Sequence, residues 1–352
     1  MSAPRSPGRS FSPERGTAAV LRCFSGMPRW DVVIVGAGPA GLSAALVLGR
    51  AGRKVLLCDT GTPRSWASKE MHGFLTRDGI SPTEFRRIAH REIARYRSVV
   101  FRRIEVTRAK RLQDGSFRVT LKGQRAVSTR KLLLATGVFD QLPPLAGIEQ
   151  FFGTSVFQCP YCDGWEVRGA PIAVYGKRQR GLEMARAMTA WTRDIALCTD
   201  GASRLSASAQ EHLRRNGVEL IEDRIQALVG DRGTLRAISF RSGRVLPRSA
   251  LFFDTPCSEQ SKLAALLGCQ FARNGGIKCG QYEATSVPGV FVAGNIIKDV
   301  QLSVVAAAEG TRAAFGINRA LTREDWDRRA TGARRVQHPS VTDPSMERRR
   351  SK

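Results

Sequence analysis

Two cysteines separated by two residues lie near the middle of the chain, in the segment C-P-Y-C-D-G at residues 159–164. At this spacing two thiols can close a small disulfide ring and reopen it. Asp163 directly follows the second cysteine, and a carboxyl group there can supply or remove a proton. The pattern therefore predicts dithiol–disulfide exchange, with Cys159, Cys162 and Asp163 as the candidate catalytic residues.

The chain before this pair predicts a nucleotide-binding βαβ unit over residues 30–59. A strand is expected at 31–35, a helix at 42–50 and a second strand that ends in an acid. The turn between the first strand and the helix reads G-A-G-P-A-G, whose glycines permit a tight turn and the close approach of a pyrophosphate. The helix N-terminus then faces the phosphates, and the acid can accept hydrogen bonds from ribose hydroxyls. The candidate binding residues are Gly36, Gly38, Pro39, Ala40, Gly41 and Asp59.

A second unit of this kind follows the cysteine pair, but its turn is altered. Strands are expected at 171–175 and 195–198, with a helix at 181–191 between them. The turn reads G-K-R-Q-R-G, so Arg178 replaces the middle glycine, and its side chain blocks the approach that a pyrophosphate needs. Asp200 follows the next strand without a basic pair, which would repel a 2′-phosphate and suit a plain ribose. The turn argues against both NADPH and NADH, and Asp200 argues further against NADPH.

Two more strand ends are expected at the first sheet. A hydrophobic strand runs to Ala-Thr-Gly at 135–137, and a strand within 285–295 ends in Ala-Gly-Asn. A helix rich in small residues is expected at 301–318, with its positive N-terminal end directed at a bound group. The candidate cofactor-binding residues here are Ala135, Thr136, Gly137, Gly294, Asn295, Gln301 and Leu302.

Together these segments resemble the low-molecular-weight thioredoxin reductases over residues 30–320, and 72–79 with 159–166 looks like a bacterial branch of that group. The resemblance implies an α/β fold of two Rossmann-like three-layer domains. It implies a discontinuous FAD-binding domain at 28–145 and 255–322, and an inserted pyridine-nucleotide-type domain at 146–254 that carries the cysteine pair.

The same resemblance implies FAD as the cofactor and gives each reactive group a role. Cys162 would be the thiol near the flavin, Cys159 would attack the disulfide of the partner, and Asp163 would be the acid–base group. Gln301 would lie at the edge of the flavin ring. Asn295 stands where the family has an aspartate, and its amide can still form hydrogen bonds to the flavin side chain. A homodimer is implied by the resemblance alone.

The partner and the direction of electron flow stay open at this level. A thioredoxin-like protein or a small dithiol or disulfide would serve as substrate. The alternatives are a small-molecule dithiol oxidase that uses oxygen, a reductase that takes electrons from ferredoxin, and a non-catalytic flavin-binding sensor. The intact cysteine pair with its acid argues against the sensor, and the altered second turn argues against ordinary reduction by NADPH.

A glutaredoxin-type motif, a zinc site and a pair of inert thiols fit the cysteine pair less well. In glutaredoxins Cys-Pro-Tyr-Cys begins a helix near the start of a small domain, whereas here Asp-Gly follows at once in a long α/β chain. A zinc site needs a second pair or nearby histidines, and the sequence has no second C-x-x-C and only 4 His. Two inert thiols would rarely fall by chance between two βαβ units.

Length and composition fit a globular protein of two domains. The 352 residues are 42% hydrophobic, and no apolar run approaches the length of a membrane span. The net charge is +25, but the sequence has no nucleic-acid-binding motif, so a solvated basic surface is expected rather than a nucleic-acid partner. The chain has 8 Cys with only one close pair, which predicts a reducing, cytoplasmic location.

Both ends are expected to lie outside the globular part. Residues 1–27 are rich in Ser, Pro, Arg and Gly, predict a disordered extension, and leave Met27 as a possible true start. Residues 323–352 form a charged tail, and the chain is expected to fray after about Ala320.

Overall fold

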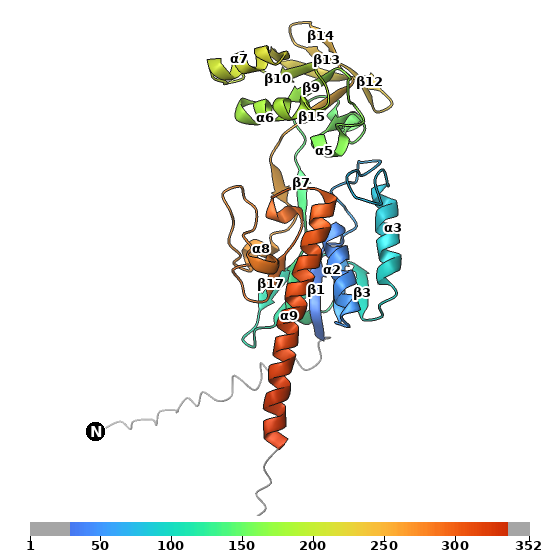
Figure 1. Ribbon diagram of the computed structural model, residues 1–352, viewed down its shortest axis with the longest axis vertical. Coiled ribbons are helices and arrows are strands. Elements are labelled where there is room, and N and C mark those ends of the chain that lie inside the picture. Colours follow the sequence, from blue (N-terminus) through green and yellow to red (C-terminus); the bar gives the residue numbers. More distant parts are fainter. Residues whose placement is uncertain (1–28, 337–352) are drawn as a thin grey trace, which may run out of the picture.

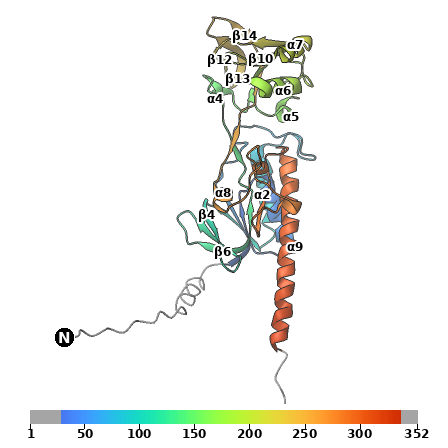
Figure 2. The same ribbon diagram turned by 90° about the vertical axis from the view of Figure 1, so that its left-hand side faces the viewer.

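A computed structural model describes residues 29–336 of the chain, which form two lobes (Figures 1 and 2). The lower lobe in Figure 1 contains the beginning and the end of the described chain, and the upper lobe is built from the middle of the sequence. The predicted extension at 1–27, with Met27, lies outside the described residues, as does the chain beyond 336.

A seven-stranded sheet forms the centre of the lower lobe. Its order is β3-β2-β1-β6-β5-β4, with β17 paired to β6. The strands β3, β2, β1, β6 and β17 run parallel. The strands β5 and β4 continue the sheet through antiparallel pairs. The parallel strands are buried apolar runs, as expected where both faces of a sheet are covered. The bounds are β1 (Arg29–Val35), β2 (Val55–Asp59), β3 (Val99–Arg103), β4 (Val106–Arg111), β5 (Phe117–Leu121), β6 (Val127–Leu134) and β17 (Val290–Val292).

Two helices cover one face of this sheet and touch each other closely. They are α2 (Pro39–Arg50) and α9 (Ser303–Val336), and α3 (Pro82–Ile93) lies beside α2. A Cβ atom on Gly310 of α9 would collide with the carbonyl oxygen of Ala40 in α2, so a glycine is needed at this crossing. The shorter elements of the lobe are α8 (Leu263–Leu266), η1 (Gln281–Glu283) and η2 (Asn295–Ile297).

The expectation that the chain frays after about Ala320 is wrong, because α9 continues to Val336. Acidic side chains on this part of the helix pair with basic side chains of the sheet region. Arg53 donates to Asp325 at 2.7 Å, and Arg130 donates to Glu324 at 2.9 Å. These contacts hold residues 321–325 against the lower lobe. The charged side chains that suggested a solvated tail are therefore bound to the folded lobe.

The upper lobe has three layers. A parallel sheet of order β11-β10-β9-β15-β8 has α6 and α7 on one face and an antiparallel sheet, β12-β13-β14, on the other. This is the predicted Rossmann-like α/β architecture, and the fold class is confirmed. The bounds are α4 (Ile148–Phe151), β8 (Val156–Phe157), α5 (Pro160–Asp163), β9 (Ile172–Tyr175), α6 (Arg178–Met188), β10 (Ile195–Cys198), α7 (Ala207–Arg215), β11 (Val218–Ile221), β12 (Ile225–Asp231), β13 (Thr234–Phe240), β14 (Val245–Pro247) and β15 (Ala250–Phe253).

The chain passes between the lobes through two short strands. These are β7 (Val138–Asp140) and β16 (Cys257–Glu259), which pair antiparallel. In Figure 1 β7 stands at the junction, and α5 lies at the side of the upper lobe that faces the lower lobe. No helix within residues 29–336 combines the length and the apolar character needed to cross a membrane.

Candidate active site

A cavity of about 1510 Å³ lies at the junction and is lined by both lobes. The lower lobe contributes the ends of β1, β2 and β6, the start of α2 and the segment before α9. The upper lobe contributes α5 with both cysteines of the pair. The volume exceeds the 300–1,000 Å³ typical of small-ligand pockets, so an extended dinucleotide and a second reactant can share it.

The turn between β1 and α2 has the geometry that a pyrophosphate site requires. Gly36 has a φ of +106°, and a Cβ atom on it would collide with the carbonyl oxygen of Ala135. A Cβ atom on Gly41 would collide with the carbonyl oxygen of Gly36, whereas a Cβ atom on Gly38 would meet nothing within 4 Å. Gly38 instead borders the cavity, next to Pro39 and Ala40. Since no side chain caps the start of α2, its N-terminal N–H groups are available to an anion.

Two further polar groups bear on whether this cavity fits FAD. The Thr136 hydroxyl borders the cavity, is buried, and has no hydrogen-bond partner among the described residues. Such a group favours a bound partner, because an unpaired buried hydroxyl is costly. The Asp59 carboxylate accepts from the amides of Ala37 and Gly61, each at 3.0 Å, and from Arg86 at 2.7 Å. It therefore holds the turn itself, and because a carboxylate has about four acceptor positions, one stays open to a ribose hydroxyl at the cavity.

The remaining predicted cofactor residues also border the cavity. The Gly294 amide donates to Glu309 of α9 at 2.6 Å, which fixes the turn after β17. The lining residues from the predicted set at these strand ends are Ala135, Gly137, Gly294, Asn295, Gln301 and Leu302. The donors, the tight turn and the open approach at Gly38 fit the dinucleotide part of FAD.

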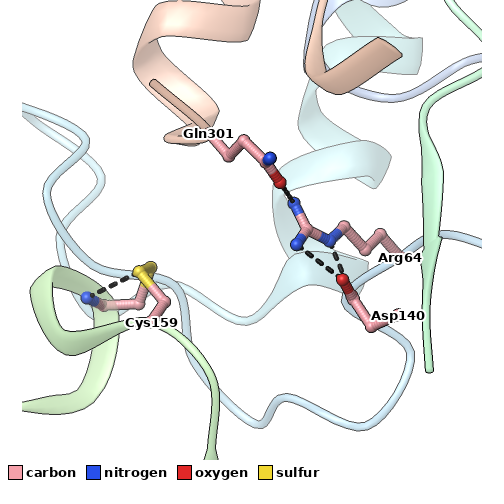
Figure 3. Close-up of a disulfide and its surroundings, with 5 residues drawn as sticks. Arg64, Asp140, Cys159 and Gln301 are labelled. Carbon is pink, nitrogen blue, oxygen red and sulfur yellow. Dashed lines mark hydrogen bonds and ion pairs between the residues drawn. A yellow bond between two sulfur atoms is a disulfide. The ribbon is translucent and has the colours of Figure 1, made fainter. Parts of the chain in front are cut away.

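Figure 3 shows a polar network in this cavity that the sequence did not indicate. Arg64 makes two hydrogen bonds to Asp140, both 2.6 Å long, and donates a third to the Gln301 side chain at 2.5 Å. The Asp140 side chain is only 7% exposed. Arg64 lies in the loop after β2, Asp140 ends β7, and Gln301 precedes α9. No motif marks Arg64 or Asp140, and Gln301 was expected only beside the flavin ring, because the three segments meet only in the folded chain.

Cys159 and Cys162 form a disulfide at the start of α5. Cys159 is the N-cap of this short helix, and its sulfur accepts from the Cys162 amide at 3.1 Å. Between them, Tyr161 packs edge-on against Trp191 at 5.5 Å yet remains 74% exposed. A Cβ atom on Gly164 would lie 2.8 Å from the Trp191 ring, so glycine lets the end of α5 sit against that ring. The pair is thus held on a fixed turn that borders the cavity.

The pKa of Asp163 is raised to about 7, mainly by burial; the Glu166 carboxylate contributes to the increase and His72 opposes it. A carboxyl group with a pKa near neutrality can both donate and accept a proton during a catalytic cycle. The three predicted catalytic residues, Cys159, Cys162 and Asp163, therefore lie together at the cavity. His72 and Glu166 belong to this setting, and they lie in the segments 72–79 and 159–166, whose resemblance to the bacterial branch gives neither residue a role.

The turn between β9 and α6 is organised differently from the first glycine-rich turn. Arg178 has a φ of +54°, and its amide donates to the Ser203 carbonyl at 3.0 Å. Ser203 is fully buried, and its carbonyl oxygen already occupies this amide. Asp200 accepts from the Ile225 amide at 3.0 Å. The Arg178 amide and the Asp200 carboxylate of the second unit thus already form hydrogen bonds to the protein itself.

No cluster of three or more His, Cys, Asp or Glu suited to a metal ion occurs among residues 29–336. The disulfide, the Asp163 carboxyl group and the glycine-rich turn after β1 all border the one cavity. Residues 30–310 match the family described as pyridine nucleotide-disulphide oxidoreductase. The chain belongs to this family.

Individual proteins similar to this chain agree with this assignment. A putative thioredoxin reductase, TrxB, from Bacillus anthracis has 32% identity and a TM-score of 0.80, with 84% of this chain and 99% of that chain covered. The structure of HlmI has 35% identity and a TM-score of 0.84, with 87% and 97% covered. A probable thioredoxin reductase of Arthroderma benhamiae is 31% identical over 84% of this chain and 81% of its own length. The chain is therefore a thioredoxin-reductase-like flavoprotein oxidoreductase of the low-molecular-weight type.

Proposed function

We propose that this enzyme moves electrons between FAD and an external dithiol or disulfide through the Cys159–Cys162 pair. The observation that carries the proposal is that the disulfide and the glycine-rich turn at 36–41 border one cavity. The turn would hold the pyrophosphate, and Thr136 and Asn295 would contact other parts of the cofactor. Bound FAD would supply the two-electron redox chemistry.

The cysteines and the acid would carry out the exchange with substrate in two steps. In the reducing direction, the Cys159 thiolate attacks one sulfur of the substrate disulfide, and that bond breaks. The departing substrate thiolate takes a proton from Asp163. Cys162 then attacks the Cys159 sulfur, which releases the second substrate thiolate and closes the Cys159–Cys162 disulfide. The substrate gains two electrons and the enzyme pair loses two.

In the reducing direction, the proposed substrate is a thioredoxin-like protein. The proposed enzyme is a homodimer and is located in the cytoplasm. The relatives named as thioredoxin reductases support a protein partner. The exposure of Tyr161, between the two cysteines, supports access by a large substrate. A small disulfide or dithiol is the alternative that the size of the cavity permits.

A second candidate runs the exchange in reverse: a small dithiol reduces the pair and oxygen is the final acceptor. The hydrogen bond from the Arg178 amide to the Ser203 carbonyl favours this candidate, because that amide is then not free to donate to the pyrophosphate of a nicotinamide cofactor. It weakens the case for NADPH or NADH as the donor, and a ferredoxin-fed reductase would satisfy the same observation.

The test uses purified holoenzyme and the separate variants Cys159→Ser and Cys162→Ser. We expect both to keep FAD and to lose thiol-dependent turnover, since each lacks one partner of the disulfide. Cys279→Ser is the matched control: this half-buried cysteine does not border the cavity, and its variant should turn over normally. Thiol-dependent turnover that persists in either active-site variant contradicts the proposal.

The electron donor is tested by anaerobic titration of the flavin absorbance. Bleaching by NADPH or NADH supports the reductase and shows that the second turn tolerates the cofactor. Bleaching by dithiothreitol alone supports the dithiol oxidase or a ferredoxin-fed enzyme. A flavin that dithiothreitol does not bleach contradicts transfer through the cysteine pair.

A further inference from the structure

A rigid loop of the lower lobe presents His72 to the redox centre. The Met71 amide donates to the Ile80 carbonyl at 2.9 Å, and the Gly79 amide donates to the Met71 carbonyl at 3.0 Å. Within this small hairpin the Gly73 amide donates to the Asp78 carboxylate at 2.8 Å. These bonds close the loop on both sides of His72, and its imidazole, 19% exposed, borders the cavity.

Three carboxylates surround the His72 ring, each at 3.6 Å. Glu70 and Asp78 belong to the same loop, whereas Glu166 belongs to the upper lobe, three residues after Asp163. The Glu70 and Asp78 side chains are 58% and 71% exposed, and that of Glu166 is 38% exposed. The contact to Glu166 is thus the least solvated of the three and the one that crosses between lobes.

Both His72 and Glu166 influence the pKa of Asp163. Its pKa is raised mainly by burial; among charges, Glu166 raises it and His72 lowers it. Glu166 and His72 therefore act on the pKa of Asp163 in opposite directions, so its protonation state depends on the balance between them. Asp163 must change its protonation state as the disulfide opens and closes, so this balance bears directly on the exchange.

We propose that His72 and Glu166 are positioning residues that form an inter-lobe pair and set the protonation state of Asp163. The proposal rests on the proposed function, in which Asp163 serves the sulfur chemistry. The pair forms only where the loop at 71–80 meets the segment after α5. It therefore links the protonation of the acid to the arrangement in which the disulfide faces the FAD cavity.

The test compares holoenzyme carrying His72→Asn with holoenzyme carrying Glu166→Gln. Removal of the His72 side chain should move the titration of Asp163 to higher pH, and removal of the Glu166 carboxylate should move it to lower pH. The titration is followed by carbon NMR of protein labelled at its aspartate carboxyls, with Asp163→Asn to assign the signal. The pH profile of thiol-dependent turnover should shift in the same two directions. His212→Asn, on the exposed side of α7, should leave both unchanged.

Opposite shifts in the two variants support the proposal. Unchanged titration in both, or shifts in one direction for both, overturn it, because a general disturbance of α5 would not depend on the sign of the removed charge. Retained FAD absorbance and an unchanged unfolding temperature show that each variant is folded. If the Cys159→Ser variant keeps thiol-dependent turnover, the proposed function fails. If Cys159→Ser loses turnover but Asp163 titrates alike in the wild type, His72→Asn and Glu166→Gln, only the inference about His72 and Glu166 fails.

Discussion

At the scale of single residues, the proposed exchange depends most on the protonation state of Asp163. A carboxyl group with its ordinary pKa would be ionised at neutral pH and could only accept a proton. Burial raises the pKa of Asp163 to about 7, so both forms are present near neutrality. The same residue can thus protonate a departing thiolate in one direction and activate an attacking thiol in the other.

Asp163→Asn should lower turnover by roughly 10²–10⁴-fold, the usual contribution of a positioned acid or base. In the wild type the protonated carboxyl is present below pH about 7 and is lost as the pH rises. Reduction of a substrate disulfide should therefore slow above that pH, while oxidation of a dithiol should speed up. Steady-state rates measured in both directions between pH 5 and 9 check this.

The control for this prediction is Asp231→Asn, at an exposed position at the end of β12. It should leave both profiles unchanged. A pH dependence near neutrality that survives in Asp163→Asn would show that another group titrates there, and it would remove Asp163 from the acid–base role.

At the scale of elements, the turn between β1 and α2 separates what glycine does for the fold from what it does for a ligand. Gly41 is packed against the backbone of Gly36, and Gly38 faces open space at the cavity. Gly41 therefore serves the packing of the turn, and Gly38 leaves room for a ligand.

Gly41→Ala should destabilise the protein by roughly 1–3 kcal/mol, because its methyl group meets a backbone carbonyl that cannot move freely. Gly38→Ala, at a φ of −75°, should leave the stability of the FAD-free protein within about 0.5 kcal/mol of the wild type. It should nevertheless weaken FAD binding, because the methyl group occupies the approach to the backbone. Urea unfolding of the FAD-free proteins and fluorescence titration with FAD measure the two effects. Equal FAD affinity in Gly38→Ala and the wild type would argue against a pyrophosphate at this turn.

Local patterns predicted the elements that carry the chemistry, and long-range contacts account for what was missed. The strand, turn and helix at 31–50 follow from glycine spacing and apolar runs, which are properties of neighbouring residues. The extent of α9 depends on pairs such as Arg53 with Asp325, which are 272 residues apart in sequence. A charged segment without its partners resembles a solvated tail. The raised pKa of Asp163 likewise comes from burial, which a six-residue motif does not reveal.

At the scale of the whole molecule, the junction between the lobes determines whether the disulfide and the glycine-rich turn at 36–41 border the same cavity. Within residues 29–336, the chain passes between the lobes only at the short pair β7–β16. The loop after β2 reinforces it: Trp66 lies 6.0 Å from the Phe152 ring, and Arg64 binds Asp140 at the end of β7. The loop therefore touches the connecting strand, the upper lobe and the segment before α9.

The ion pair between Arg64 and Asp140 should be the most sensitive of these contacts. Arg64→Met leaves the Asp140 carboxylate, 7% exposed, without the partner that makes both of its hydrogen bonds. Removal of one member of a buried pair costs about 3–5 kcal/mol, whereas replacement of both by apolar residues is often neutral. Arg64→Met should thus lower the free energy of unfolding by that amount, and Arg64→Met combined with Asp140→Leu should recover most of it. Urea unfolding of the three proteins without FAD, followed by tryptophan fluorescence, measures the difference. A single variant within about 1 kcal/mol of the wild type would mean that solvent reaches Asp140 and that the junction is held by other contacts.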